Sequence, residues 1–167
     1  YSLLIESIGD FMQKKQYLIH ANVAIGKAPL DSNIMSGFVQ NIEKINTVGS
    51  ESHGFISLPA LDDAGEIYVG DSLVNLSIWE SIEDLKNFTY TGIHAEVLKK
   101  RRSWFKEQSI PNYVLFWFDA AVKPKEADVK ERIEYLTKFG PTPYAFNFRN
   151  SFTMGEAEVY QTGSEGL

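Results

Sequence analysis

The sequence has no cysteine among its 167 residues. This absence excludes disulfides, thiolate metal sites and cysteine nucleophiles, and it leaves no sign of an oxidising compartment. We therefore expect a cytoplasmic protein. Because the chain starts at Tyr1 rather than Met, the question of a targeting segment ahead of it stays open.

Basic residues and long apolar runs are also scarce. The formal net charge of -6 argues against nucleic acid as the main partner, because binding phosphates requires a concentrated basic surface. The one basic run, Lys99–Arg102, is expected on a solvated helix face, with phosphate binding as the less favoured alternative. No apolar run approaches the roughly 20 residues that cross a bilayer, so we expect no membrane partner.

Motifs for bound metals and cofactors are missing as well. The three histidines include no pair four residues apart, so a metal site is not expected. The loop Lys27-Ala28-Pro29-Leu30 is not a glycine-rich phosphate cradle, and no serine nucleophile elbow is present. We expect no cofactor.

Hydrophobic residues make up 44% of the chain, which is enough for one sizeable core. We predict a single domain at 17–153, preceded by a helix or arm at 1–16 and followed by a flexible tail at 154–167. The arm carries apolar residues at helical spacing, namely Leu4, Ile8, Phe11 and Met12.

Strand-like alternation gives the segments 17–25 and 73–79 a core face and a polar face each. The core faces hold Ile19, Ala21, Val23 and Ile25, and Val74, Leu76 and Ile78. The polar faces hold His20 and Asn22, and Asn75, Ser77 and Trp79.

Further strands are predicted at 53–59, 66–79, 113–122 and 144–149. The predicted features along them are a turn at Asp62–Gly65, a bulge at Gly70–Asp71 and a buried central position for 113–122. A first helix is predicted to start at Asp31 or Ser32 and to carry an apolar stripe of Ile34, Phe38, Ile42 and Ile45. A second helix is predicted to start at a Ser81 cap, and after a break at Thr91–Gly92 a third is predicted to run to Lys106. A fourth helix is predicted from Pro124 to Gly140.

This order of elements predicts an α+β protein with a ferredoxin-like antiparallel sheet and helices on one face. The other face then needs a cover. A second copy of the same sheet is the simplest one, so we predict a homodimer.

Several motifs resemble a known family. Trp79-Glu80-Ser81 at a strand-to-helix junction, followed by a helix and His94, resembles the dimeric α+β barrel superfamily, which includes antibiotic biosynthesis monooxygenases. More closely, the chain resembles the bacterial family called domain of unknown function 3291 over about 17–148. The motifs that carry this likeness are Asn22 with Lys27 to Leu30, Val74 to Ser81, His94, Arg101 to Phe105 and Gly140 to Pro143.

The superfamily resemblance implies several activities without choosing among them. It includes cofactor-independent monooxygenases, haem-degrading enzymes, haem-dependent peroxidases and lyases, and small proteins with no known reaction. The haem-degrading branch has a Trp and, ten residues on, a His where this chain has Phe88 and Leu98. This departure counts against haem degradation, so haem is a less favoured ligand.

By strand parity, one sheet face collects polar and aromatic side chains: Asn22, Asn75, Ser77, Trp79, Trp117 and Asn147. Such a face is typical of a ligand pocket, although the same groups would also suit the wet side of a dimer interface. His94 on the covering helix either exchanges protons near neutral pH or is a structural residue bonded to a backbone carbonyl. His20 and His53 are expected to be structural.

Arg101 and Trp104 are the remaining candidates for substrate binding. Arg101, with Arg102 and Trp104 nearby, would bind an anionic or planar ligand, or Arg101 would pair with Glu96 or Glu107. Trp79 and Trp104 are also consistent with plain core aromatics.

These residues support two hypotheses of function. The first is a small-molecule enzyme, monooxygenase-like or a cyclase or isomerase, acting on a hydrophobic, polyketide-like or aromatic substrate. His94 would move the proton, and Asn22 and Asn75 would orient a substrate oxygen. The second is a non-catalytic dimeric protein that binds a small apolar ligand or haem. A third possibility is a dimer without ligand, its face closed by Trp79 against Trp117.

Overall fold

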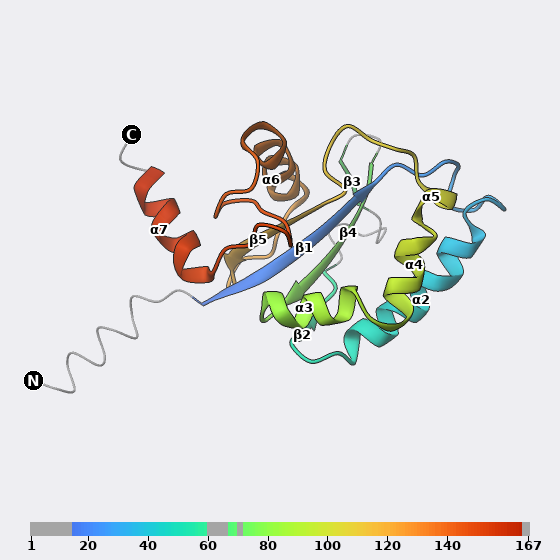
Figure 1. The fold of residues 1–167 in the computed structure, drawn as a ribbon, viewed down its shortest axis with the longest axis horizontal. Helices are drawn as coiled ribbons and strands as arrows, with labels where there is room; N and C mark the ends of the chain where they lie inside the picture. Colours follow the sequence, from blue (N-terminus) through green and yellow to red (C-terminus); the bar gives the residue numbers. More distant parts are fainter. Residues whose placement is uncertain (1–14, 60–66, 70–71, 165–167) are drawn as a thin grey trace, which may run out of the picture.

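The computed structural model describes residues 15–59, 67–69 and 72–164. The predicted helix or arm at 1–16, apart from its last two residues, and the turn at 62–65 lie outside these ranges. The described chain forms an antiparallel sheet with helices on both faces (Figure 1), so the predicted α+β class is confirmed.

The sheet is built around β1 (Gln16–Ala24), which pairs with β4 (Ser72–Trp79) on one side and β5 (Tyr113–Asp119) on the other. The free edge of β4 pairs with β2 (Phe55–Ser57) near Trp79 and with β3 (Ile67–Val69) near Ser72. The strand order is β2-β4-β1-β5.

One face of the sheet carries the apolar residues that the alternation predicts, among them Ile19, Leu76 and Phe116. The helix α6 (Glu126–Phe139) packs on this face with a stripe of Val129, Ile133 and Leu136. The stripe follows the helical period of 3.6 residues, and the helix ends at Gly140, whose φ of 72° suits glycine at a helix C-terminus.

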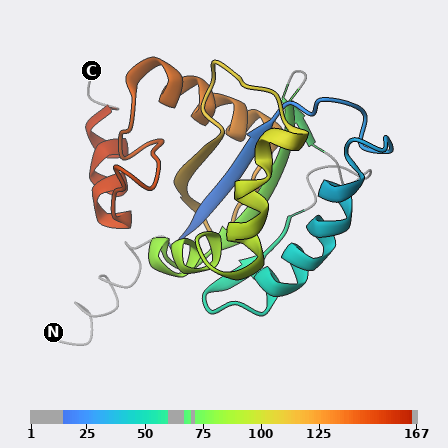
Figure 2. The ribbon, with the colours of Figure 1, turned by 45° about the vertical axis from the view of Figure 1, so that its right-hand side comes forward.

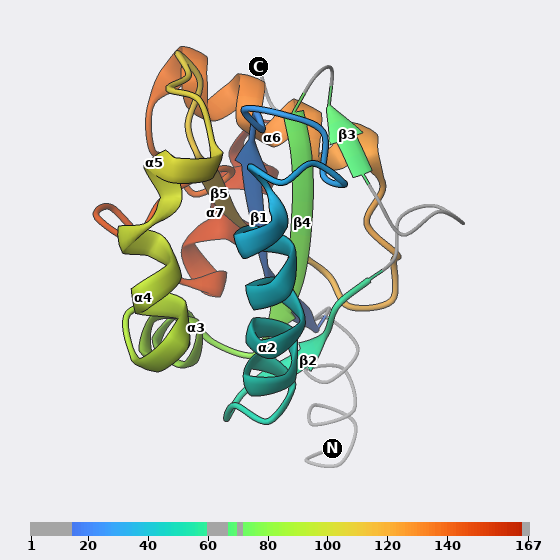
Figure 3. The same cartoon turned by 90° about the vertical axis from the view of Figure 1, so that its right-hand side faces the viewer.

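The opposite face lies under the remaining described helices that follow β1 and β4. These helices are α2 (Ser36–Ser50), α3 (Ile82–Thr89), α4 (Gly92–Lys99) and α5 (Arg101–Trp104). Figure 2 and Figure 3 show α2 and α4 as neighbours on this side of the sheet. The prediction that all helices lie on one face is therefore wrong, because α6 covers the other.

The position of α6 also removes the reason given for a homodimer. Ile19, Ala21, Val23 and Phe116 are fully buried within a single chain. This face therefore needs no second sheet to cover it. The homodimer itself stays a prediction.

Three predicted strands differ from the structure. Residues 66–79 do not form one bulged strand, because β3 and β4 pair antiparallel, with Val69 opposite Ser72. The strand β5 is buried but not central, since β1 is its only partner among the named strands. Residues 144–149 form two isolated bridges, Phe146 to Leu115 and Ala145 to Thr142, in place of a strand.

Helix boundaries differ as well. The helix α2 begins at Ser36, because backbone turns from Pro29 to Ser32 and from Ser32 to Met35 precede it. The helical segment before Lys106 is split into α4 and α5. The Ser81 cap of α3 is confirmed, since the Ser81 hydroxyl accepts a hydrogen bond from the Asp84 backbone N–H at 3.1 Å.

The predicted flexible tail is wrong over most of its length, because residues Met154–Ser164 form the helix α7. Thr153 and Glu156 exchange hydrogen bonds between side chain and backbone at its start, at 3.2 and 2.7 Å. This is the capping-box pattern of a threonine followed three residues later by glutamate. Ala157 is 2% exposed and belongs to the core.

Candidate active site

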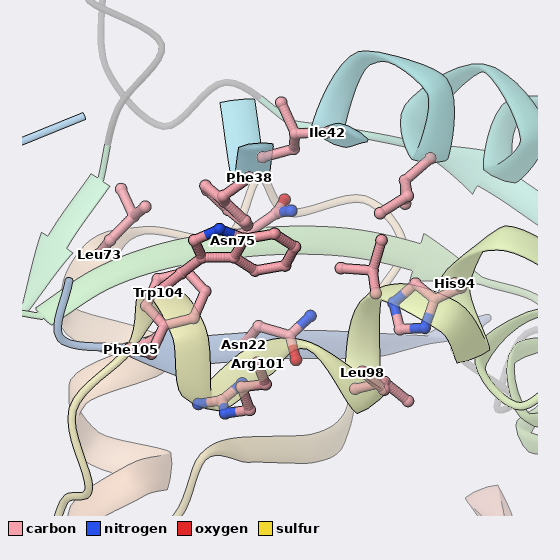
Figure 4. Close-up of a pocket in the computed structure, with 13 residues that line it drawn as sticks. Asn22, Phe38, Ile42, Leu73, Asn75, His94, Leu98, Arg101, Trp104 and Phe105 are labelled. Atoms are coloured by element: carbon pink, nitrogen blue, oxygen red, sulfur yellow. The ribbon is translucent and has the colours of Figure 1, made fainter. Parts of the chain in front are cut away.

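A pocket opens between the sheet, α2 and the α4–α5 segment, on the face away from α6. Its space for water-sized spheres is about 90 Å³, and about 640 Å³ lies within it when the open solvent at its mouth is included. Its walls are mostly apolar, formed by Ala24, Phe38, Ile42, Ile45, Leu73, Val97, Leu98, Trp104 and Phe105. Figure 4 shows His94 at one end and Trp104 with Phe105 at the other, with Asn22 and Asn75 between them.

The floor of the pocket is polar because of one cross-strand pair. Asn22 of β1 lies directly opposite Asn75 of β4, and both side chains are half-buried. Neither carboxamide has a hydrogen-bond partner within the described part of the chain. Each therefore offers a donor and an acceptor to a ligand.

His94 lies on α4 and is held in one tautomer. Its Nδ1 is 2.9 Å from the backbone carbonyl oxygen of Thr89. A carbonyl only accepts hydrogen bonds, so Nδ1 carries the proton and Nε2 keeps its lone pair. Burial lowers the pKa of His94, although the bond to Thr89 raises it in part. The imidazole is therefore neutral near pH 7, with a basic nitrogen available to the pocket.

A smaller inner chamber, with a volume of about 30 Å³, shares His94, Asn22 and Asn75 with the pocket. Its floor is formed by His20, Ser77 and Trp79, on the same sheet face as Asn22 and Asn75. The Trp79 indole N–H donates to the Ser77 hydroxyl at 2.8 Å, and that hydroxyl lies 3.5 Å from Nδ1 of His20. Ser77 and Trp79 therefore line the inner chamber.

Trp79 is fully buried, and its ring stacks on Phe88 with the centroids 5.2 Å apart. It is a core aromatic as well as a chamber wall. Its hydrogen bond to Ser77 holds the Ser77 hydroxyl in place on the floor of the chamber.

His20 is the residue of this site that the sequence analysis set aside as structural. It is 4% exposed, and burial together with the nearby His94 lowers its pKa to about 3. It is thus a neutral group at the bottom of the chamber. Strand alternation places His20 on the same face of β1 as Asn22, and this pattern could have identified it as a site residue.

Arg101 and Trp104 close the outer end of the pocket. The guanidinium of Arg101 donates from Nη2 to the side-chain oxygen of Asn112 at 3.1 Å and to the Val23 carbonyl at 3.5 Å. Arg101 pairs with neither Glu96 nor Glu107, so the predicted alternative of a local ion pair is wrong. Trp104 fits closely against α2, since a side-chain carbon at Gly37 would lie 3.3 Å from its ring.

Two predicted site residues lie outside the pocket. Trp117 shares the parity face, but its indole N–H donates to the Phe152 carbonyl at 2.9 Å beneath the C-terminal segment. Asn147 accepts a hydrogen bond from the Asn150 backbone at 2.9 Å and lines a separate shallow hollow near Gly140. Among the described residues, no contact joins the rings of Trp79 and Trp117, so the face is not closed by that pair.

The comparison with protein families decides the relationship of the chain. Residues 17–162 match the model described as "Domain of unknown function (DUF3291)". The chain belongs to the DUF3291 family. This confirms the resemblance and extends it beyond residue 148 into α7.

Other comparisons add little about this DUF3291 protein. A search of curated proteins finds no match. A structure from Pseudomonas aeruginosa has 7% identity and a TM-score of 0.44, covering 64% of this chain and 96% of its own. A protein of unknown function from Nitrosomonas europaea has 10% identity and a TM-score of 0.47, covering 67% and 98%. Similarity at this level carries no argument about activity.

A third neighbour, also from Nitrosomonas europaea, is described as a candidate antibiotic biosynthesis monooxygenase. It has 11% identity and a TM-score of 0.46, covering 68% of this chain and 97% of its own. Those words apply to that protein.

Two other described cationic side chains are not among the residues that line the pocket. His53 is exposed and pairs with Asp84 at 2.8 Å, which raises the pKa of His53, and Arg102 is exposed on α5. Within the described ranges, no three His, Asp or Glu side chains are grouped so as to hold a metal ion. Over the same ranges, no helix is long and apolar enough to span a membrane.

Proposed function

We propose that this DUF3291 protein is a small-molecule enzyme that removes a proton from a hydrophobic, oxygen-bearing substrate. The observation that carries the proposal is the fixed tautomer of His94, a residue that lines one pocket together with the unpartnered carboxamides of Asn22 and Asn75. A neutral imidazole is a general base, and carboxamide N–H groups stabilise negative charge on oxygen.

The chemical step follows from these roles. Nε2 of His94 takes the proton from a carbon next to a substrate carbonyl; the C–H bond breaks and the N–H bond forms. The electron pair stays on the substrate as an enolate, whose oxygen accepts hydrogen bonds from Asn22 and Asn75. If the enolate is conjugated with a C=C bond, return of the proton from His94 to the far carbon completes an isomerisation. Attack of the enolate carbon on a second carbonyl of the same substrate forms a C–C bond and an alkoxide, and the alkoxide takes the proton back from His94 to complete a cyclisation.

The apolar walls define the rest of the substrate. Side chains from α2 and α4, such as Phe38, Ile42 and Leu98, suit an aromatic or polyketide-like molecule. They also exclude water, which strengthens the hydrogen bonds to the enolate oxygen. We retain the expectations that the enzyme is a homodimer and acts in the cytoplasm.

The test begins with a thermal-shift screen of aromatic ketones, polyketide-like phenols, quinols and haem. Ligands that stabilise the protein are then incubated in D₂O, and deuterium incorporation at carbon is followed by NMR. We expect exchange by the wild type, and a loss of about 100-fold or more in His94→Gln with ligand affinity within threefold. His53→Gln removes an exposed histidine and is the matched control.

The alternative function, a non-catalytic binding protein, is favoured by the mostly apolar lining of the pocket. It predicts ligand binding without any deuterium exchange, and equal behaviour of the wild type and His94→Gln. That pattern would overturn the enzymatic proposal. Dioxygen uptake with a bound ligand would instead assign the reaction to the monooxygenase class.

A further inference from the structure

The outer end of the pocket holds a positive charge for which the described residues supply no negative partner. Among the described residues that line the pocket, only Arg101 has a cationic side chain and none carries a carboxylate. Within the described part of the chain, the guanidinium has no acidic side chain within ion-pair distance. This is unusual in a molecule with a net charge of -6.

The guanidinium is also underused as a hydrogen-bond donor. It has five N–H groups, and its hydrogen bonds to Asn112 and Val23 both come from Nη2. Its side chain is half-buried, and its planar group lies 5.4 Å from the ring centre of Phe105. A partly desolvated cation of this kind gains most from an anion that accepts two parallel hydrogen bonds.

We propose that the natural ligand is a hydrophobic carboxylate, whose acid group pairs with Arg101 while its reacting carbon lies at His94. This inference rests on the proposed function and names its substrate class.

His94 and Arg101 line the same pocket, and the apolar residues Val97 and Leu98 lie between them in the chain. We therefore expect an apolar spacer between the acid and the reacting carbon. The apolar side chains between the two ends suit such a spacer (Figure 4).

The charge of the pocket favours a carboxylate over a phosphate. One guanidinium balances a single negative charge, and the other polar groups, Asn22 and Asn75, are neutral. A phosphate monoester near neutral pH carries more charge than this pocket compensates. The planar carboxylate also matches the planar guanidinium.

The test compares acids with their neutral esters. Calorimetry at pH 7.5 measures the binding of 2-naphthoate and decanoate, and of the methyl ester of each, to the wild type, Arg101→Gln and Arg102→Gln. We expect the wild type to bind at least one acid ten or more times more tightly than its ester. Arg101→Gln should reduce this ratio to near one, and Arg102→Gln, which removes the same charge from an exposed neighbour, should leave it unchanged.

Controls separate misfolding from loss of the charge. If the Arg101→Gln variant binds the methyl ester with wild-type affinity, its pocket is folded and the change in the ratio comes from the lost charge. Arg101→Lys keeps the charge but not the planar fork, so it should give an intermediate ratio.

The outcomes also separate this inference from the proposed function. Equal binding of acid and ester by the wild type, or an unchanged ratio in Arg101→Gln, overturns the carboxylate proposal while a proton-transferring pocket still stands. Acid binding that depends on Arg101, without any exchange that depends on His94, supports the carboxylate and overturns the enzymatic role. Binding of neither acid nor ester overturns the carboxylate proposal for these two skeletons.

Discussion

His20 and His94 lie in the same chamber, and their surroundings keep both imidazoles neutral near pH 7. For His20 the cause is burial, followed by the proximity of His94. For His94 it is burial, opposed by the hydrogen bond to Thr89. His53 differs, because its pairing with Asp84 at the surface raises its pKa.

These surroundings predict the order in which the histidines titrate. We expect His20 to protonate last on acidification, near pH 3, His94 at a pH below 6.5 and His53 at a pH above 6.5. NMR of imidazole nitrogens during a pH titration measures all three, and it also shows which His94 nitrogen carries the proton at pH 7. A proton on Nε2 of His94 would contradict its role as a base toward the pocket.

Burial of His20 also makes stability depend on pH. Its pKa is about 3 in the folded state, against the ordinary histidine value of 6.5, so the unfolded chain binds more protons between these pH values. Stability is therefore retained above pH 6.5 and is lost as the pH falls toward 3, by up to about 1.4 kcal/mol per pH unit.

Urea unfolding at pH 7 and pH 5 measures this loss, which we expect to be about 2 kcal/mol in the wild type. In His20→Phe, whose ring suits the neighbouring Tyr113 and Phe148, most of the loss should disappear. His53→Gln is the control that should retain it. Equal pH dependence in the wild type and His20→Phe would show that His20 does not titrate on unfolding.

At the scale of elements, the junction between β2 and α3 depends on a close approach at Gly54. This residue has a φ of 78°, and a side-chain carbon there would lie 2.2 Å from Oδ2 of Asp84. Its carbonyl accepts a hydrogen bond from the Glu80 backbone at 2.8 Å. Asp84 in turn receives the Ser81 hydroxyl at 2.7 Å, so the turn and the helix start are held together.

Replacing Gly54 should therefore disrupt both elements. We expect Gly54→Ala to lower the free energy of unfolding by more than about 2 kcal/mol, through the disfavoured φ and the overlap with Asp84. Gly92→Ala is the matched control, since its φ is 57° and the space around it is open, so it should lose only about 1 kcal/mol. Equal losses in urea denaturation would show that the contact with Asp84 is unimportant.

At the scale of the whole molecule, the two sheet faces have different roles. The face under α6 is closed by the chain itself, and the opposite face holds the pocket between α2 and α4. A homodimer of this protein therefore has to use surfaces other than the α6-covered face.

The predicted homodimer is tested by light scattering, which should give twice the chain mass of 18.9 kDa. On dilution to monomers, hydrogen exchange in α6 should not change, because its contacts lie within one chain. A mass of 18.9 kDa at all concentrations would contradict the dimer. Increased exchange in α6 on dissociation would instead indicate that it lies at the interface.

Much of the candidate site was predictable because strand alternation is local. The period of two places Asn22, Asn75, Ser77 and Trp79 on one face whatever covers it. The start of α7 also has a local signal, since Thr153 and Glu156 have capping-box spacing, although a flexible tail was predicted there. The hairpin at 67–79 was missed because alternation continues through a reversal of chain direction.

The sequence by itself determined which side chains of β1 and β4 share a face and that the segments of α2, α3 and α6 are helical, because backbone geometry sets both periods locally. Only the tertiary structure decided which part of the face stays open. The C-terminal segment covers Trp117, whereas α2 and α4 bridge Asn22 and Asn75 without filling the space between them. Covering of this kind depends on contacts between residues far apart in the chain, and no local period encodes them.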